Sequence, residues 1–276
     1  MKILALVQYT FRELIARATM IVLASISTLV LLFCLLAFSA RTTDAGTVVR
    51  FFGNDMSTPV SGEQLQNFVG QLQSGFSGGL FLGVVLFGVL ATAGAIPDML
   101  ERGTADLYLS KPLARWQLLL GKYLGAVAVV FVNIVYFIGA LWLISGLRLG
   151  VWNLSFLSSA LLMTVVFASL YAVIVFTSVL TRTTAVAVLT AFLLIVLVEP
   201  ILHSRQTSLY LLSENGVYRA ILDGIAYALP QISGARDTVA RHIVQRPVEW
   251  GPVAQCVASG AGFFALGAWF FHRRDY

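Results

Sequence analysis

Six long apolar stretches dominate this sequence, and each comes close to the length that a helix needs to cross a lipid bilayer. A bilayer core about 30 Å thick takes roughly 20 apolar residues per helix. The predicted spans are residues 20–39, 79–96, 123–145, 156–180, 184–202 and 253–271. Only 11% of the residues are charged and 58% are hydrophobic, whereas a soluble domain carries about 25% charged residues. We therefore predict an all-α membrane protein with a single transmembrane domain over residues 1–276. The composition excludes a secreted domain, a disordered chain and most cytosolic enzymes.

Basic residues set the predicted orientation. Six spans place both termini on the same side of the membrane. If the termini are cytoplasmic, Lys2, Lys111, Lys122 and the higher density of arginine fall in the inner segments, as the positive-inside rule expects. Basic flanks that face anionic lipid then explain the net charge of +5, and no nucleic-acid partner is predicted. A cleaved signal peptide is the alternative for the first span, but the apolar run there exceeds the roughly 7–15 residues of a signal core.

Residues 1–19 read as an amphipathic helix that lies in the inner membrane interface before the first span. Its apolar residues recur at three and four positions, as on one face of a helix: Leu4, Val7, Phe11 and Leu14. The polar residues Arg12 and Glu13 lie off this stripe, together with Gln8 and Arg17. The alternative is a solvated basic leader that only fixes the topology.

The connections between the spans differ in what they predict. Residues 40–78 mix glycine with small polar residues and are expected to form a flexible outer loop. The link 181–183 is so short that the spans around it must form an antiparallel hairpin. The outer loop 203–251 is too long to be structureless. We predict short helices there, over 217–229 and about 239–244, which lie along or dip into the outer leaflet. The alternative is a small solvated subdomain.

The inner loop, residues 97–120, is longer than a turn between helices requires. It carries both signs of charge, so it is more than a basic cluster that sets topology. Residues 104–110 are predicted to form a short helix, which ends where Pro112 disfavours helix at Lys111. A short transverse helix of this kind suits docking into a groove on a soluble partner. Spacing alone leaves this interpretation and that of a plain surface loop open.

This loop resembles the ABC type-2 transporter permease family, the membrane subunits of type V ABC exporters. The residues that carry the resemblance are Glu101-Arg102-Gly103-Thr104, Leu107, Leu109, Lys111-Pro112-Leu113-Ala114-Arg115 and Leu119-Leu120-Gly121-Lys122-Tyr123. Residues 11–14 likewise look like the amphipathic connecting helix of the family. Ala114 stands where serine is common. Within the family, the sequence is most similar to the permeases for maturation of multi-copper enzymes, including nitrous oxide reductase.

The resemblance implies a division of labour. The permease would pair with a second permease copy and bind two copies of a separate ABC ATPase, in the plasma membrane of a bacterium or archaeon. ATP and Mg²⁺ would bind to that ATPase, so this chain would need no cofactor and would not be an enzyme. The implied coupling residues are Glu101, Arg102, Gly103, Thr104, Asp106, Lys111, Pro112 and Arg115.

Polar residues within the spans are the candidates for a translocation path. They are Asn133, Thr164, Thr177 and Glu199. Such groups often only join neighbouring helices. Glu199, near the outer end of the fifth span, either marks a mouth or is an interfacial carboxylate paired with Arg205.

Three functions compete on these observations. The first is an exporter permease driven by a partner ATPase, and the second is an ATP-coupled membrane subunit that transmits force or regulates without moving a substrate. The third, a membrane-embedded enzyme, would need clustered His, Asp or Glu at one depth, and the sequence shows no such cluster. Cys34, Met20 and Met163 share no face that the sequence establishes, so no metal site is predicted.

Overall fold

The computed structural model describes residues 2–43, 46–55, 62–100 and 114–273. In this part of the chain, five helices are long and apolar enough to cross a membrane. They are Ala18–Ala37 (α2), Arg115–Leu149 (α6), Leu154–Thr181 (α7), Thr184–His203 (α8 to α9) and Gly251–Arg273 (α12). The chain is therefore a mainly helical, multi-pass membrane protein.

The predicted span 79–96 does not form one continuous apolar helix of spanning length. It falls within α3 (Gly62–Thr92), which continues through a short 3₁₀ turn, Ala93–Ala95, into α4 (Pro97–Leu100). The apolar helical stretch recognised here, Val85–Met99, is shorter than a span. Six spans thus stay a prediction, with five supported by the length and hydropathy of the described helices.

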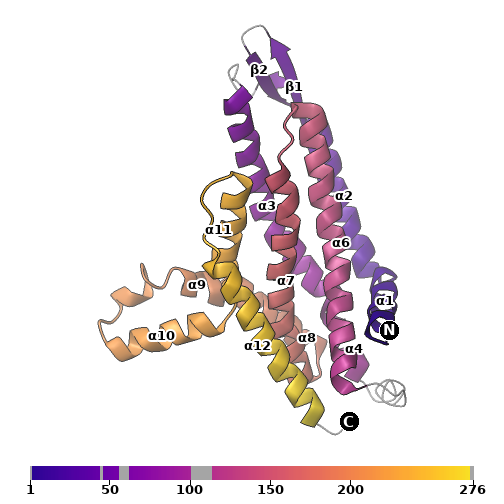
Figure 1. Cartoon of the computed structure of the whole chain (residues 1–276), viewed down its shortest axis with the longest axis vertical. Coiled ribbons are helices and arrows are strands. Elements are labelled where there is room, and N and C mark those ends of the chain that lie inside the picture. The colour runs from indigo at the N-terminus through magenta and orange to yellow at the C-terminus, as the bar shows by residue number, and fades with distance from the viewer. Residues whose placement is uncertain (1, 44–45, 56–61, 101–113, 274–276) are drawn as a thin grey trace.

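The helices form an elongated bundle around α3, α6 and α7 (Figure 1). Helix α2 packs on α6, and α12 packs along α7. The N-terminal helix α1 (Lys2–Ile15) packs against α6 near the end where both chain termini lie, which we call the terminal end. The opposite end carries the strands β1 (Phe38–Thr43) and β2 (Gly46–Phe51), and we call it the hairpin end.

The expectation of a flexible loop over residues 40–78 is wrong. Strands β1 and β2 pair antiparallel, with Phe38 opposite Phe51, and a two-residue strand β3 (Asn54–Asp55) extends the sheet. The Phe38 ring packs 5.4 Å from that of Phe51 and 6.0 Å from that of Phe76 on α3. The second part of the expected loop is helical. A glycine in a helix costs about 1 kcal/mol relative to alanine, which weakens the helix without breaking it. Helix α3 can therefore begin at Gly62, because its apolar residues recur at helical spacing and pack inward.

Helix α6 extends well beyond its predicted span of 123–145. It runs for 35 residues and ends at Gly150, which adopts a left-handed conformation with φ 71°. Helix α7 then begins after Asn153, whose side chain accepts hydrogen bonds from the backbone N–H groups of Ser155 and Phe156. At the other end of α7, Arg182 takes φ 57° in the tight link to α8 (Thr184–Leu193).

The connection from α8 to α12 carries short helices. A π-helical turn, Leu194–Val198, leads into α9 (Glu199–His203). A 3₁₀ turn, Leu209–Leu211, precedes α10 (Gly216–Ala228), which projects sideways from the bundle in Figure 1. Helix α11 (Ile232–Ile243) packs instead on α7 and α3, and begins about seven residues before the short helix expected at 239–244.

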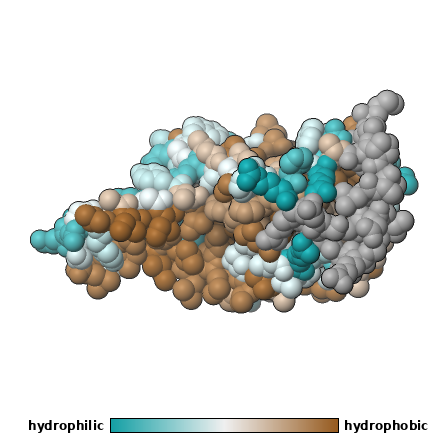
Figure 2. Space-filling model, turned by 90° about the horizontal axis from the view of Figure 1, so that it is seen from below, coloured by the Kyte–Doolittle hydropathy of each residue, from teal (hydrophilic) through white to brown (hydrophobic). Residues whose placement is uncertain are grey.

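Hydrophobic side chains cover much of the outer surface. Leu29, Leu36 and Leu161 expose 66%, 65% and 61% of their area on α2 and α7. Figure 2, seen from the terminal end, shows hydrophobic residues over most of the visible described surface and hydrophilic ones in a few patches. A surface of this kind is stable against lipid tails, because apolar side chains cost nothing to leave in hydrocarbon.

Candidate functional site

The predicted ATPase contacts fall on the loop 97–120, up to the first residue of α6. The residues Glu101, Arg102, Gly103, Thr104, Asp106, Lys111 and Pro112 lie outside the described residues. Arg115, the first residue of α6, donates a hydrogen bond of 3.4 Å to the carbonyl of His272 at the end of α12. The described flanks of the inner loop are thus α4 and the start of α6, and both lie at the terminal end (Figure 1).

Four charged residues meet beside these flanks, and we call them the terminal ion cluster: Glu13, Arg17, Asp98 and Lys122. The Lys122 ammonium lies 2.6 Å from one carboxylate oxygen of Glu13. The Arg17 guanidinium lies 3.0 Å from the other Glu13 oxygen and 2.7 Å from Asp98. The cluster therefore joins α1, the α1–α2 junction, α4 and α6 through three consecutive ion pairs.

Burial makes the ion pair of Lys122 and Glu13 costly to break. The Lys122 side chain is only 3% exposed, and a charge removed from water must be paired to be tolerated. Burial opposes ionisation of Glu13, but the hydrogen bonds and charges of Lys122 and Arg17 outweigh it and lower the pKa of the Glu13 carboxyl. Burial likewise opposes the charge on Arg17, and Asp98 and Glu13 outweigh it, so the pKa of Arg17 is raised. Glu13 and Arg17 are therefore both charged at neutral pH.

Two glycines let α1 approach α6 closely enough for these contacts. A Cβ atom on Gly121 would lie 2.6 Å from the Cβ of Leu6, and one on Gly125 would lie 2.5 Å from the Cβ of Thr10. Small residues four positions apart allow two helix backbones to pack closely. Helix α1 is therefore docked on α6 through a specific groove.

The face of α1 that packs inward differs from the predicted apolar stripe. Leu14 is fully buried, but Leu4 is 74% exposed. Glu13, expected off the stripe, turns toward α6, while Arg12 is exposed. Sequence reasoning missed this arrangement. The only local signal was the spacing of Glu13 and Arg17, four residues apart on one helical face.

The polar residues predicted to line a path make separate contacts. Asn133 on α6 accepts a 3.2 Å hydrogen bond from Ser27 on α2. Thr164 and Thr177 both donate to carbonyls of their own helix, α7, at 2.8 Å and 3.1 Å. The Asn133 bond joins two helices, whereas the two threonine bonds stay within α7.

Glu199 is buried at the first turn of α11. Its side chain accepts hydrogen bonds from the backbone N–H of Ser233, at 2.7 Å, and from the Ser233 hydroxyl. The alternative that Glu199 pairs with Arg205 is wrong, because Arg205 binds Asp223 at 2.8 Å. The physical reason is the free N–H groups of the first turn of α11, which attract a carboxylate.

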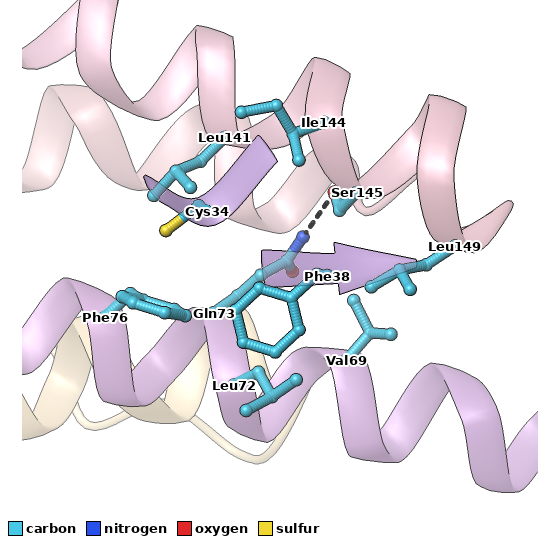
Figure 3. A pocket seen from close by; sticks show the side chains of 10 residues that line it. All are labelled: Cys34, Phe38, Val69, Leu72, Gln73, Phe76, Leu141, Ile144, Ser145 and Leu149. Atoms are coloured by element: carbon cyan, nitrogen blue, oxygen red, sulfur yellow. Dashed lines mark hydrogen bonds between the residues drawn. The ribbon is translucent and has the colours of Figure 1, made fainter. Parts of the chain in front are cut away.

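A buried polar network near the hairpin end also escaped the sequence analysis. Gln73 on α3 donates to Ser145 on α6 at 2.9 Å, and Asn153 donates to the Gln73 side-chain oxygen and to the Ile243 carbonyl, both at 2.9 Å. Beside it lies an apolar cavity of about 40 Å³ that Cys34 lines (Figure 3). Within the described ranges, no three His, Cys, Asp or Glu side chains come together as metal ligands.

Comparison with known families decides the assignment. The model of the family described as ABC-2 family transporter protein matches residues 10–276. The chain belongs to the ABC-2 transporter family. This match confirms the family that the motifs between Glu101 and Tyr123 indicated, and it implies an ABC transporter with an ATPase partner. A search of curated proteins gave no match.

Membership of the ABC-2 family indicates in what kind of protein the terminal ion cluster lies. ABC-2 family proteins are membrane subunits, so this chain is the membrane part of a transporter. In this ABC-2 protein, the cluster links α4 to α6, the two described helices at the ends of the segment 97–120.

Proposed function

We propose that this chain is the membrane-spanning permease subunit of an ATP-driven exporter, in which two permease copies carry two copies of a separate ATPase. The terminal ion cluster is the observation that carries this proposal. It connects the two flanks of the loop 97–120 to α1, which is where a force applied to that loop would enter the bundle.

The route from loop to bundle has two branches. On one side, α4 is tied through Asp98 to Arg17, at the junction that leads directly into α2. On the other side, α6 is a continuous helix of 35 residues, about 50 Å long at 1.5 Å per residue. A push on the loop would therefore tilt α6 and shift α2 together, because Glu13 links the two branches through Lys122.

The proposed contacts with the ATPase are electrostatic. Glu101, Asp106, Lys111 and Arg115 would meet complementary charges in a groove of the ATPase, and the helix expected at 104–110 would fill that groove. ATP and Mg²⁺ would bind in the ATPase, on the cytoplasmic side where both termini of the permease would lie. Closure of the two ATPases around ATP would then alternate the exposure of the permease interior.

Co-isolation with the ATPase tests this proposal. The chain is expressed together with the ABC ATPases of the same genome and purified through a tag on the chain. We expect the ATPase to co-purify, and we expect Glu101→Lys or deletion of residues 104–110 to uncouple ATP hydrolysis from transport while the chain stays folded. Glu63→Lys, at the opposite end of the bundle, is the matched control. Failure of the ATPase to co-purify with the unaltered chain contradicts the proposal.

A second function is favoured by one observation. The hydroxyl groups of Thr164 and Thr177 donate to carbonyls of their own helix, and Asn133 accepts a hydrogen bond from Ser27. The polar groups predicted to line a path are therefore engaged in contacts within the bundle. A subunit of this kind could pass the ATP-driven movement to another protein without moving a substrate. A flux assay with the reconstituted complex separates the two functions, because only the exporter moves a solute across vesicles.

A further inference from the structure

A partly enclosed pocket lies between α3, α7 and α11, and no function described so far uses it. Its volume is about 210 Å³. Ser74 and Ser77 from α3, Met163 from α7, and Arg236 and Asp237 from α11 line it. Helix α11 lies beside the halves of α3 and α7 that point to the hairpin end (Figure 1), so the pocket is remote from the terminal ion cluster.

The Ser77 hydroxyl is the first sign of a ligand. Ser77 is only 5% exposed, and its oxygen has no hydrogen-bond partner among the described residues. A serine or threonine within a helix can bond the carbonyl four residues earlier, as Ser169 and Thr164 do here. A buried hydroxyl left without a partner costs about 1–3 kcal/mol. The Ser77 hydroxyl can therefore donate a hydrogen bond to a ligand in the pocket or accept one from it.

The second sign is a pair of opposite charges that line the same pocket. Arg236 and Asp237 approach to 4.0 Å, which is beyond hydrogen-bond distance, and their side chains keep 41% and 52% of their area exposed. His203 lies 3.7 Å from the other oxygen of Asp237. Among the residues that line the pocket, Arg236 and Asp237 are the two charged ones, and their charges cancel. Asp237 would repel an anion, and Arg236 would repel a cation. A ligand that carries both charges therefore complements the pocket best.

We propose that this pocket binds a compact zwitterion, with its anionic group at Arg236, its ammonium group at Asp237 and an oxygen at Ser77. Two sources share this chemistry. One is the phosphoethanolamine headgroup of a phospholipid, and the other is a free amino acid. The inference goes beyond the proposed function and is independent of it, because binding to the pocket requires no ATPase.

Binding of zwitterionic probes to the full chain tests the proposal. The chain is placed in nanodiscs of phosphatidylglycerol and titrated calorimetrically with glycerophosphoethanolamine, which has the phosphodiester of the lipid headgroup, and with glycine. At least one probe is expected to bind. We expect Ser77→Ala and Arg236→Gln each to weaken that binding about tenfold, as the loss of one hydrogen bond to a charged group does. Arg241→Gln is the matched control, because Arg241 lies on the same helix and pairs with Glu249 at 2.8 Å outside the pocket. Ser77→Ala only removes an unbonded hydroxyl, so it keeps the fold.

A second arm identifies the source. The chain is purified from membranes that contain phosphatidylethanolamine, and retained lipid is counted by native mass spectrometry. Retention of phosphatidylethanolamine that Ser77→Ala abolishes supports the lipid headgroup, and binding of glycine without retained lipid supports the free amino acid. The proposal is overturned if neither probe binds and no lipid is retained. It is also overturned if inorganic phosphate binds as tightly as glycerophosphoethanolamine and Asp237→Asn leaves binding unchanged.

Discussion

Two charged clusters hold two parts of this molecule, and they are built in opposite ways. The terminal ion cluster joins residues 109 positions apart, on separate helices of the bundle. The second, which we call the arm cluster, consists of Arg205, Tyr210 and Asp223. The arm cluster joins residues at most 18 positions apart. The first cluster therefore fixes how helices of the bundle meet, whereas the second fixes only the local path of the connection from α9 to α10.

Removal of the Glu13 carboxylate is expected to have the largest effect. Glu13→Gln takes the partner from the nearly buried Lys122 ammonium and also from Arg17. Breaking a buried pair from one side costs about 3 kcal/mol or more. Thermal unfolding of the purified chain in nanodiscs measures the loss.

Lys122→Met is the matched variant for this prediction. It removes the buried charge itself, and Glu13 keeps Arg17 at 3.0 Å. It should therefore destabilise less than Glu13→Gln. Equal stability of Glu13→Gln and the unaltered chain would show that the terminal ion cluster does not hold α1 on α6.

Acidification should weaken the same contact, by no more than the substitution does. The pKa of Glu13 is lowered from its ordinary value of 4.5. Its stabilising contribution is therefore complete above the value of the unfolded chain and is lost as the pH falls through the lower value of the folded chain. The difference in unfolding temperature between the unaltered chain and Glu13→Gln should be large at neutral pH and shrink below about pH 4.5. A difference that stays constant over this range contradicts the prediction.

A larger side chain at Gly125, where α1 packs against α6, should also loosen α1, but it should destabilise the chain less than Glu13→Gln. In Gly125→Leu, the added Cβ would lie 2.5 Å from the Cβ of Thr10. Overpacking of this kind costs about 1–3 kcal/mol. Hydrogen exchange of the α1 amides should speed up. Gly139→Leu on the same helix is the control, because a Cβ there meets nothing within 4 Å, and its α1 should exchange like that of the unaltered chain.

Loosening the arm cluster should have the smallest effect on the whole chain. Hydrogen bonds from Tyr210 and Arg205 hold the pKa of Asp223 below its ordinary value. In Asp223→Asn we expect faster hydrogen exchange only between residues 205 and 223, with an unchanged unfolding temperature. A global loss of stability comparable to that of Glu13→Gln would remove the distinction between the two clusters.

The contrast between the clusters also shows what the sequence could predict. Long apolar runs such as 123–145 and 156–180 indicated membrane helices, because lipid admits few other structures. The motif residues from Glu101 to Tyr123 indicated the family. The pairing of Glu13 with Lys122 could not be predicted, because it depends on how closely α1 approaches the glycines of α6. The start of α3 at Gly62 was missed since its glycines look like breaks in a helix.

Within the predicted path, the error was one of partners. Glu199 and Arg205 are close in sequence and carry opposite charges, so local reasoning offered their pairing as one of two alternatives. The fold instead offers Glu199 the first turn of α11, with Ser233 as donor, and gives Arg205 to Asp223. Tertiary packing decided this choice between two chemically reasonable partners.

Whether the terminal ion cluster carries ATP-driven movement is the central question, and Asp98→Asn addresses it most directly. Asp98 is 44% exposed, so its loss breaks the link from α4 to Arg17 without unfolding the chain. Spin labels at Gln66 on α3 and at Arg246 beyond α11 report the hairpin end in the complex of the permease with its ATPase. We predict that ATP changes the distance between these labels in the unaltered complex, and that Asp98→Asn abolishes this change while ATP hydrolysis continues. The same ATP-dependent change in Asp98→Asn would contradict a coupling role for the cluster.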